Sequence, residues 1–212
     1  MSKTKVFEKY YKEYDEWFDK NRHIYQSELN AIKRLIPNNK YGLEVGVGTG
    51  RFAFPLGIRI AVEPSVKMAE QARKLGIKVY ENRAEDLPFE NNTFDFLLFV
   101  TSVCFVDNIF QSLSEARRVL KKEGLIIISF IDKESILGKQ YALSKNSSKF
   151  YKEATFYSVT GMINILKKSG FKVQSINQTV FHPSKQRIET SKKGYGKGSF
   201  VSIKAGLVEL FK

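Results

Sequence analysis

The sequence predicts an α/β protein built on a doubly wound, Rossmann-like sheet of seven strands, mostly parallel, with an antiparallel final strand. Apolar runs alternate with amphipathic segments from residue 41 onward. The run at residues 94–100 is nearly unbroken, as is typical of a parallel strand covered on both faces. Alternating strands and helices require parallel pairing through right-handed crossovers. The last two apolar runs, at residues 171–181 and 199–207, have only a loop between them, so we expect them to pair antiparallel.

The first part of the chain predicts N-terminal helices followed by a strand and a glycine-rich turn. Apolar residues recur at helical spacing over residues 5–36, and Pro37 ends that region. The first strand then runs directly into the turn at residues 46–50, and a helix is expected after the turn, from Arg51. A second strand is expected at residues 58–62.

The central elements continue the alternation. Ser65 is placed to cap a helix that Gly76 stops, and residues 77–81 predict a third strand. After the fourth strand, Asp107 is expected to cap a helix that closes at residues 121–124.

A polar stretch follows the fifth strand, which is expected at residues 125–130. This stretch is rich in Lys and Ser and runs from residue 132 to 156. It is too long for a simple connection and begins at the edge of the sheet where ligands bind, so we expect a substrate-side insertion. Ser158 is placed to cap a last helix that ends at Gly170.

The glycine-rich turn indicates a nucleoside site. Glycine lets the backbone take positive φ angles and approach a ligand without a Cβ in the way. Glu63 follows at the end of the second apolar run, where a carboxylate is suited to bind ribose hydroxyls. The third glycine, Gly50, comes one residue earlier than in a dinucleotide fingerprint, and Arg51 occupies the fingerprint position. This spacing opposes a nicotinamide cofactor.

The pattern Glu-x-Gly-x-Gly-x-Gly, which begins at Glu44, resembles motif I of class I S-adenosylmethionine-dependent methyltransferases. In that family the turn wraps the methionine and ribose end of S-adenosylmethionine, and S-adenosylhomocysteine is the product. The resemblance implies cofactor contacts from the turn and from the end of the second strand, at Glu44, Gly46, Val47, Gly48, Gly50, Glu63 and Pro64.

Residues 84–89 are similar to the subgroup that includes ubiquinone-biosynthesis-type methyltransferases. In that subgroup, groups just after the third strand contact the adenine, which implies contacts from the Ala84 backbone and from Glu85. Arg83 stands where the usual pattern has an Asp. Thr101 begins the segment after the fourth strand, at the carboxyl edge of the sheet, and is a further expected contact.

We expect the methyl acceptor to be bound by aromatic residues of the N-terminal helical region and by the segment after the fourth strand. The residues expected there are Tyr10, Tyr14, Phe18, Cys104 and Phe105. Tyrosine on an apolar helix face suits a pocket wall, because buried hydroxyls need partners; the alternative is a seam that only anchors the helix. Many relatives carry a histidine near Cys104, which leaves no evident base here, and this cysteine is more typical of a small buried residue. His182 is either a candidate base or an ordinary loop residue.

Composition excludes several classes of protein. The chain has 212 residues and a net charge of +13, but its lysines are spread along the chain, which favours general solubility over nucleic-acid binding. We find no signal-peptide core and no run long enough to span a membrane, so we expect a cytoplasmic protein without a membrane partner. The single cysteine excludes an intramolecular disulfide and a thiolate zinc site, and no metal is expected.

These observations predict a one-domain S-adenosylmethionine-dependent methyltransferase with a small-molecule acceptor. The first alternative is a nucleic-acid methyltransferase, which the absence of an Asn/Asp-Pro-Pro-Tyr/Phe motif after the fourth strand opposes. The second alternative is a non-catalytic cofactor-binding protein or an oxidoreductase domain; the glycine spacing opposes a nicotinamide, and the missing base leaves a binding-only role open. The expected parts are an N-terminal helical cover (residues 1–40), a cofactor-binding core (41–131), the substrate-side insertion (132–156) and a helix with the terminal strand pair (157–212).

Overall fold

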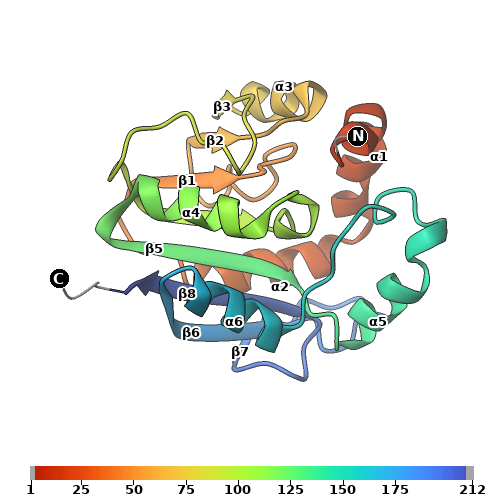
Figure 1. Ribbon diagram of the computed structural model, residues 1–212. Coiled ribbons are helices and arrows are strands. Elements are labelled where there is room, and N and C mark those ends of the chain that lie inside the picture. Colours follow the sequence, from red (N-terminus) through yellow and green to blue (C-terminus); the bar gives the residue numbers. More distant parts are fainter. Residues whose placement is uncertain (1–2, 209–212) are drawn as a thin grey trace.

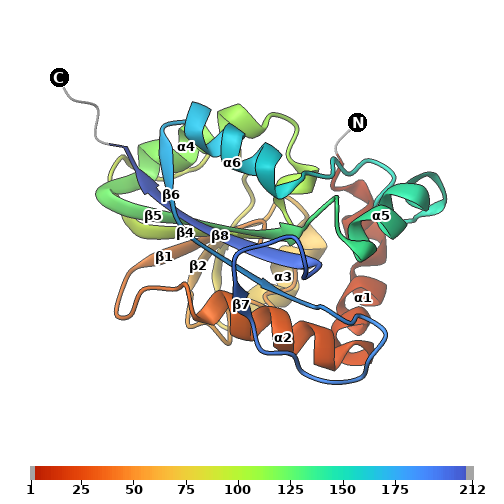
Figure 2. The same ribbon diagram turned by 90° about the horizontal axis from the view of Figure 1, so that it is seen from below.

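The structure, a computed structural model, describes residues 3–208 and consists of a central sheet with helices on both faces. Figures 1 and 2 show α4 and α6 on one face of the sheet and α2 and α3 on the other. Helices α1 and α5 lie beyond the carboxyl ends of the parallel strands (Figure 1). This is the doubly wound α/β fold that the sequence predicts.

The sheet of the described chain has eight strands in the order β3-β2-β1-β4-β5-β8-β6-β7. Strands β1 to β5 pair in parallel, and β8 runs antiparallel to both β5 and β6. The extra strand relative to the seven expected is β7, which has two residues at the edge. The strands are β1 (Gly42–Val45), β2 (Ile60–Val62), β3 (Lys78–Tyr80), β4 (Phe94–Val100), β5 (Leu120–Ile131), β6 (Phe171–Thr179), β7 (Lys192–Lys193) and β8 (Phe200–Leu207).

The helices begin where side chains can satisfy the first free backbone N–H groups. Ser65 accepts from the Met68 N–H and Ser158 from the Gly161 N–H, as the sequence predicts. The helices are α1 (Lys5–Lys20), α2 (Arg22–Lys33), α3 (Val66–Lys74), α4 (Ile109–Val119), α5 (Ile136–Leu143) and α6 (Val159–Lys168), with short 3₁₀ turns η1 (Val103–Phe105) and η2 (Lys145–Ser147).

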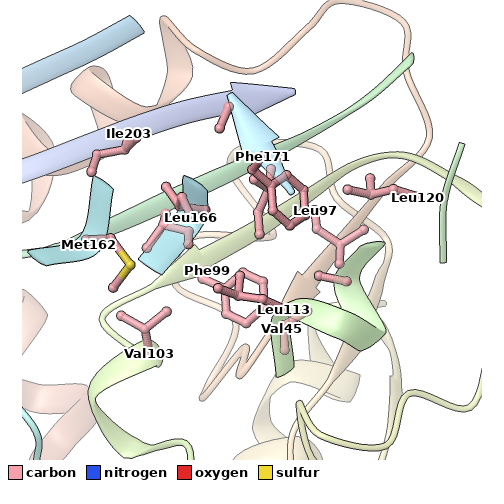
Figure 3. Close-up of a cluster of buried hydrophobic side chains, with 14 of the residues drawn as sticks. Val45, Leu97, Phe99, Val103, Leu113, Leu120, Met162, Leu166, Phe171 and Ile203 are labelled. Atoms are coloured by element: carbon pink, nitrogen blue, oxygen red, sulfur yellow. The ribbon is translucent and has the colours of Figure 1, made fainter. Parts of the chain in front are cut away.

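Each face of the sheet has its own apolar core. Under α4 and α6, side chains of β4, β5 and β8 form one buried cluster, and Figure 3 shows Phe99, Leu113 and Leu166 within it. On the other face, α1, α2 and α3 pack through residues such as Phe18 and Ile32. Because both faces are covered, polar groups that bind a ligand are confined to the ends of the strands.

Three local expectations are wrong. Residues 51–57 form a series of turns in place of a helix, because Pro55 has no N–H to donate and Gly57 has a φ of +75°. The cap of α4 is Asn108, whose Oδ1 accepts two backbone N–H groups, because the Asp107 carboxylate is paired with Arg83. Residues 121–124 belong to β5, since Gly124 does not take the left-handed conformation that ends a helix.

No helix within residues 3–208 is both long enough and apolar enough to cross a membrane.

We predict that a buried hydroxyl pair fixes the position of β8 against β5. Ser129 and Ser202 lie directly opposite each other, both have no exposed surface, and the Ser129 hydroxyl donates to the Ser202 oxygen at 2.8 Å. Ser129→Ala leaves one buried hydroxyl unpaired and is expected to lower the free energy of unfolding by about 1–3 kcal/mol in urea titrations. Because Ser129→Ala/Ser202→Ala removes both partners, it should cost less than the two single variants combined; strictly additive losses would contradict the coupling.

Candidate functional site

A cavity of about 480 Å³ lies at the carboxyl ends of the parallel strands, where a doubly wound sheet binds its ligands. Its floor comes from the segments that follow β1, β2, β3 and β4. Helices α1 and α2 supply one wall, and α5 and the residues after it supply another. Its volume is within the range of small-molecule sites.

The three glycines of the turn have different structural roles. Gly46 and Gly48 line the cavity with φ angles of +76° and +56°. A Cβ on Gly46 would lie 2.6 Å from the Cβ of Ser102, so the β1 and β4 ends can approach only because no side chain is present. Gly50 lies outside the cavity lining and packs on α3 and the start of β3, where a Cβ would lie 3.0 Å from Ile77.

Glu63 connects the glycine turn to the start of α3. One carboxylate oxygen accepts from the Gly48 N–H and the other from the Ser65 N–H, each at 2.9 Å. The side chain is buried and lines the cavity, and burial raises its pKa to about 7 in spite of these hydrogen bonds, which lower it. Pro64 lies beside it in the lining. A carboxylate with free lone pairs therefore faces the cavity at the end of β2.

Glu44 does not reach the cavity. It is buried, one of its oxygens has no hydrogen-bond partner within residues 3–208, and burial together with the charge of Glu63 raises its pKa well above the usual range. Burial disfavours the charged form of this carboxyl, and a hydrogen bond from the Ala53 backbone, just after the turn, opposes that effect in part. Val47 is likewise buried in the core and absent from the lining.

The segment after β3 forms the part of the lining expected to receive an adenine. Ala84 and Glu85 both line the cavity together with Arg83. Glu85 Oε1 accepts from the Asp107 N–H at 2.6 Å and the Asn108 N–H at 3.0 Å, which holds the loop that leads into α4. The structure thus brings this segment next to the glycine turn.

Aromatic side chains from α1 line the cavity opposite the turn. Tyr14 lies closest to the turn, since a Cβ on Gly48 would be 3.6 Å from its ring, and burial raises its pKa, with the charge of Glu63 adding to the effect. Phe18 and Phe105 also line the cavity, whereas Tyr10 does not. The residues around Phe150 close over this side, because its ring stacks on that of Phe7 at 5.8 Å.

Two residues expected near the acceptor lie outside the lining. Cys104 is buried, its thiol donates to the Thr101 carbonyl at 3.0 Å, and burial raises its pKa to about 12, so it is an inert thiol. Thr101 itself lines the cavity. The His182 ring is half-exposed and lies 2.8 Å from Glu189, and only the next residue, Pro183, reaches the cavity. This arrangement does not support His182 as a base.

Sequence reasoning missed a second set of lining residues, which come from segments far apart in the chain. Glu28 is the most unusual of them: it is 5% exposed, and burial raises its pKa to about 8. A carboxylate between Ser27 and Leu29 on the buried face of a helix was the available signal. Other lining residues that were not assigned to the site from the sequence include Trp17, Ile24, Met68, Asn82, Ser102, Ile131, Leu137, Tyr141, Phe150 and Tyr151.

An ionic cluster formed by Asp15 and Asp19 of α1 with Arg51 connects this helix to the glycine turn. Asp15 accepts from the Thr49 hydroxyl at 2.6 Å and from Arg51 Nε at 2.8 Å, while Asp19 also pairs with Arg51. The Arg51 hydrogen bond holds the pKa of Asp15 below its usual range against the opposing effect of burial. The residue at the dinucleotide fingerprint position therefore anchors a wall of the cavity.

The chain is similar to known proteins over most of its length. The model of a methyltransferase domain matches residues 43–128. An uncharacterized protein of Methanocaldococcus jannaschii is 50% identical, over 94% of this chain and 98% of its own. A ubiquinone/menaquinone biosynthesis C-methyltransferase of Rickettsia felis is 28% identical, over 85% of this chain and 79% of its own.

A solved structure from Thermotoga maritima is similar in both sequence and fold. It is described as an S-adenosylmethionine-dependent methyltransferase and a "possible histamine N-methyltransferase". It is 47% identical, with a TM-score of 0.94 over 96% of this chain and 99% of that chain.

We predict that the ionic cluster around Arg51 restrains α1. Asp15→Ala removes two charge-assisted contacts between α1 and the turn, so backbone amides of residues 11–20 should exchange with deuterium about tenfold faster. Glu16→Ala is the matched control, because Glu16 forms an ion pair with Lys20 on the exposed face of the same helix and is not part of the cluster around Arg51. Equal exchange rates in the two variants would show that the cluster does not hold the helix.

Proposed function

The chain belongs to the class I S-adenosylmethionine-dependent methyltransferases, and from this premise we propose that it transfers a methyl group from S-adenosylmethionine to a small-molecule acceptor. The observation that supports this best is the meeting of Gly46, Gly48 and Glu63 on the floor of one cavity. The same cavity extends beyond the expected nucleoside position. There it is lined by aromatic side chains of α1 and α5, such as Tyr14 and Tyr141.

The residues present fit S-adenosylmethionine. Gly46 and Gly48 allow the cofactor to approach the backbone, and Glu63 offers acceptor lone pairs for ribose hydroxyls. When bound, the cofactor supplies a methyl group on a positively charged sulfur. Acidic and aromatic groups such as Glu63 and Tyr14 favour a cation in this cavity.

The distribution of charge supports a small-molecule acceptor over a nucleic acid. The chain carries +13, yet the ionisable acid and base side chains of the lining are Glu13, Glu28, Glu63 and Glu85 against the single Arg83. Phosphates would meet four carboxyl groups at the site where transfer must occur. Aromatic side chains of the lining limit the access of water to an acceptor, and positioning an acceptor in line with the donor supplies much of the catalysis of such a transfer.

We expect the affinity for S-adenosylhomocysteine to depend on the ionisation of Glu63. Because its pKa in the free protein is about 7, the carboxylate form predominates above pH 8, and affinity should fall by up to about tenfold per pH unit below pH 7. In Glu63→Gln the affinity should be about tenfold weaker at pH 8 and nearly independent of pH from 6 to 8. Titration calorimetry measures both effects.

The control for this prediction is Glu81→Gln, which removes a carboxylate that pairs with Arg73 on the exposed side of the molecule. Its affinity and pH profile should match those of the parent chain. A parent chain whose affinity stays constant from pH 6 to 8 would argue against Glu63 as the titrating ribose ligand.

Methyl transfer itself is tested with S-adenosylmethionine labelled in the methyl group. The label is expected in small-molecule fractions of a metabolite extract, with release of one S-adenosylhomocysteine for each methyl group transferred. Parallel incubation with total RNA and with DNA should leave the nucleic acid unlabelled. Label in the nucleic acid would favour that acceptor class, and binding of S-adenosylhomocysteine without any labelled product would favour a binding-only role.

A further inference from the structure

Glu28 presents an unusual chemical situation within the cavity. Its side chain lines the cavity and is 5% exposed, and within residues 3–208 its carboxyl has no hydrogen-bond partner. Its neighbour Ser27 shows the contrast, since that buried hydroxyl donates to the His23 carbonyl and accepts from the Glu189 N–H. A buried polar group without a partner is costly, which indicates a partner that the protein chain does not itself supply.

The surroundings of Glu28 are aromatic and apolar. Burial raises the pKa of Tyr14, Tyr141 and Tyr151, and the charge of Glu28 adds to the effect on each hydroxyl. The rings of Tyr141 and Tyr151 stack at 4.9 Å, and both line the cavity. Aromatic faces together with one carboxyl form an environment that favours an organic cation.

Glu28 also lies at the end of the cavity opposite the expected nucleoside site. The residues expected to bind the nucleoside follow β1, β2 and β3, which lie together in one half of the sheet. The lining residues Ile131, at the end of β5, and Pro183, after β6, come from the other half. Glu28 reaches the cavity from α2, and α2 packs on β6 and β8. A second molecule bound at this end would therefore meet Glu28 and leave the glycine turn free.

We propose that Glu28 binds the amino group of the methyl acceptor, and that this acceptor is a small amine with an aromatic or similarly apolar body. The proposal rests on the function proposed above. Glu28 forms a charge-assisted hydrogen bond with the ammonium group, and the tyrosine rings enclose the apolar part of the acceptor. The name of the Thermotoga maritima relative refers to an amine of this type.

Glu28 has a second role in this proposal, because an ammonium nitrogen has no lone pair with which to attack. The N–H bond of the bound ammonium breaks, its electron pair remains on nitrogen, and the proton moves to a carboxylate oxygen of Glu28. Burial favours the protonated carboxyl, which makes this transfer easier than it would be to a solvated carboxylate. This assignment supplies the proton acceptor that Cys104 and His182 do not.

The test uses the full chain saturated with S-adenosylhomocysteine and titrated with histamine, 2-phenylethylamine and 2-phenylethanol. The two ethyl-linked phenyl compounds differ only in the polar group, so the amine is expected to bind at least tenfold tighter than the alcohol. Amine binding at pH 7 should also release about one proton to the buffer, because the ammonium forces the Glu28 carboxyl to ionise. Calorimetry in buffers of different ionisation enthalpy counts that proton.

Glu28→Gln keeps the size of the side chain and removes its charge. It should bind S-adenosylhomocysteine as the parent does, lose the preference for the amine, release no proton, and raise the KM for an amine acceptor at least tenfold. Glu16→Gln, on the exposed face of α1, is the matched control and should behave as the parent. The comparison of amine with alcohol in the parent chain tests the proposal even if the Gln variant does not fold.

The outcomes separate the two proposals. Failure of the parent chain to bind S-adenosylhomocysteine would overturn the proposed function. Normal cofactor binding with no preference of the parent for either amine over the alcohol would overturn the amine site alone. Preference and proton release that persist in Glu28→Gln would remove Glu28 from the assignment.

Discussion

The two hydrogen bonds that Glu63 accepts hold together the part of the molecule on which the site depends. They join the glycine turn after β1 to the start of α3, and Ser65 extends the connection by donating its hydroxyl to Glu8 of α1. A buried carboxylate requires such partners, because its charge is otherwise unstable away from water. The same requirement leaves its remaining lone pairs directed at the cavity, so one residue serves structure and ligand binding together.

The second constraint is the covering of both faces of the sheet. Phe99 and Leu97 on β4 are completely buried, and apolar side chains form the clusters that cover both faces of the sheet. Carboxylates therefore collect at the carboxyl ends, while the excess of lysine and arginine lies on the outside. This separation of charge gives a basic protein an acidic cavity, and it explains why net charge alone is a poor guide to the acceptor.

The rules that located elements in the sequence failed where a contact between distant segments decided the outcome. Asp107 and Asn108 are both good caps, and only the pairing of Asp107 with Arg83 leaves Asn108 to cap α4. Gly124 follows a helix as a cap would, yet it lies in an irregular part of β5, between Leu120 and Leu125, which both pair with β4. Local preference is a difference of about 1 kcal/mol or less, so one tertiary contact can reverse it.

The sequence by itself determined the sheet, the glycine turn and the position of Glu63, because strand periodicity and the absence of a Cβ are local properties that neighbouring residues express. The sequence also predicted that the segments after β3 and β4 contact the ligand, and residues of both segments line the cavity. Only the tertiary structure decided that Glu44 is buried away from the cavity, that His182 lies beside Glu189 and outside the cavity lining, and that Glu28 lines the cavity. The physical reason is that the burial of a polar side chain depends on the elements that pack around it. The surroundings of Glu28 form only when α2 packs on β6 and β8 and α5 lies across the cavity from it.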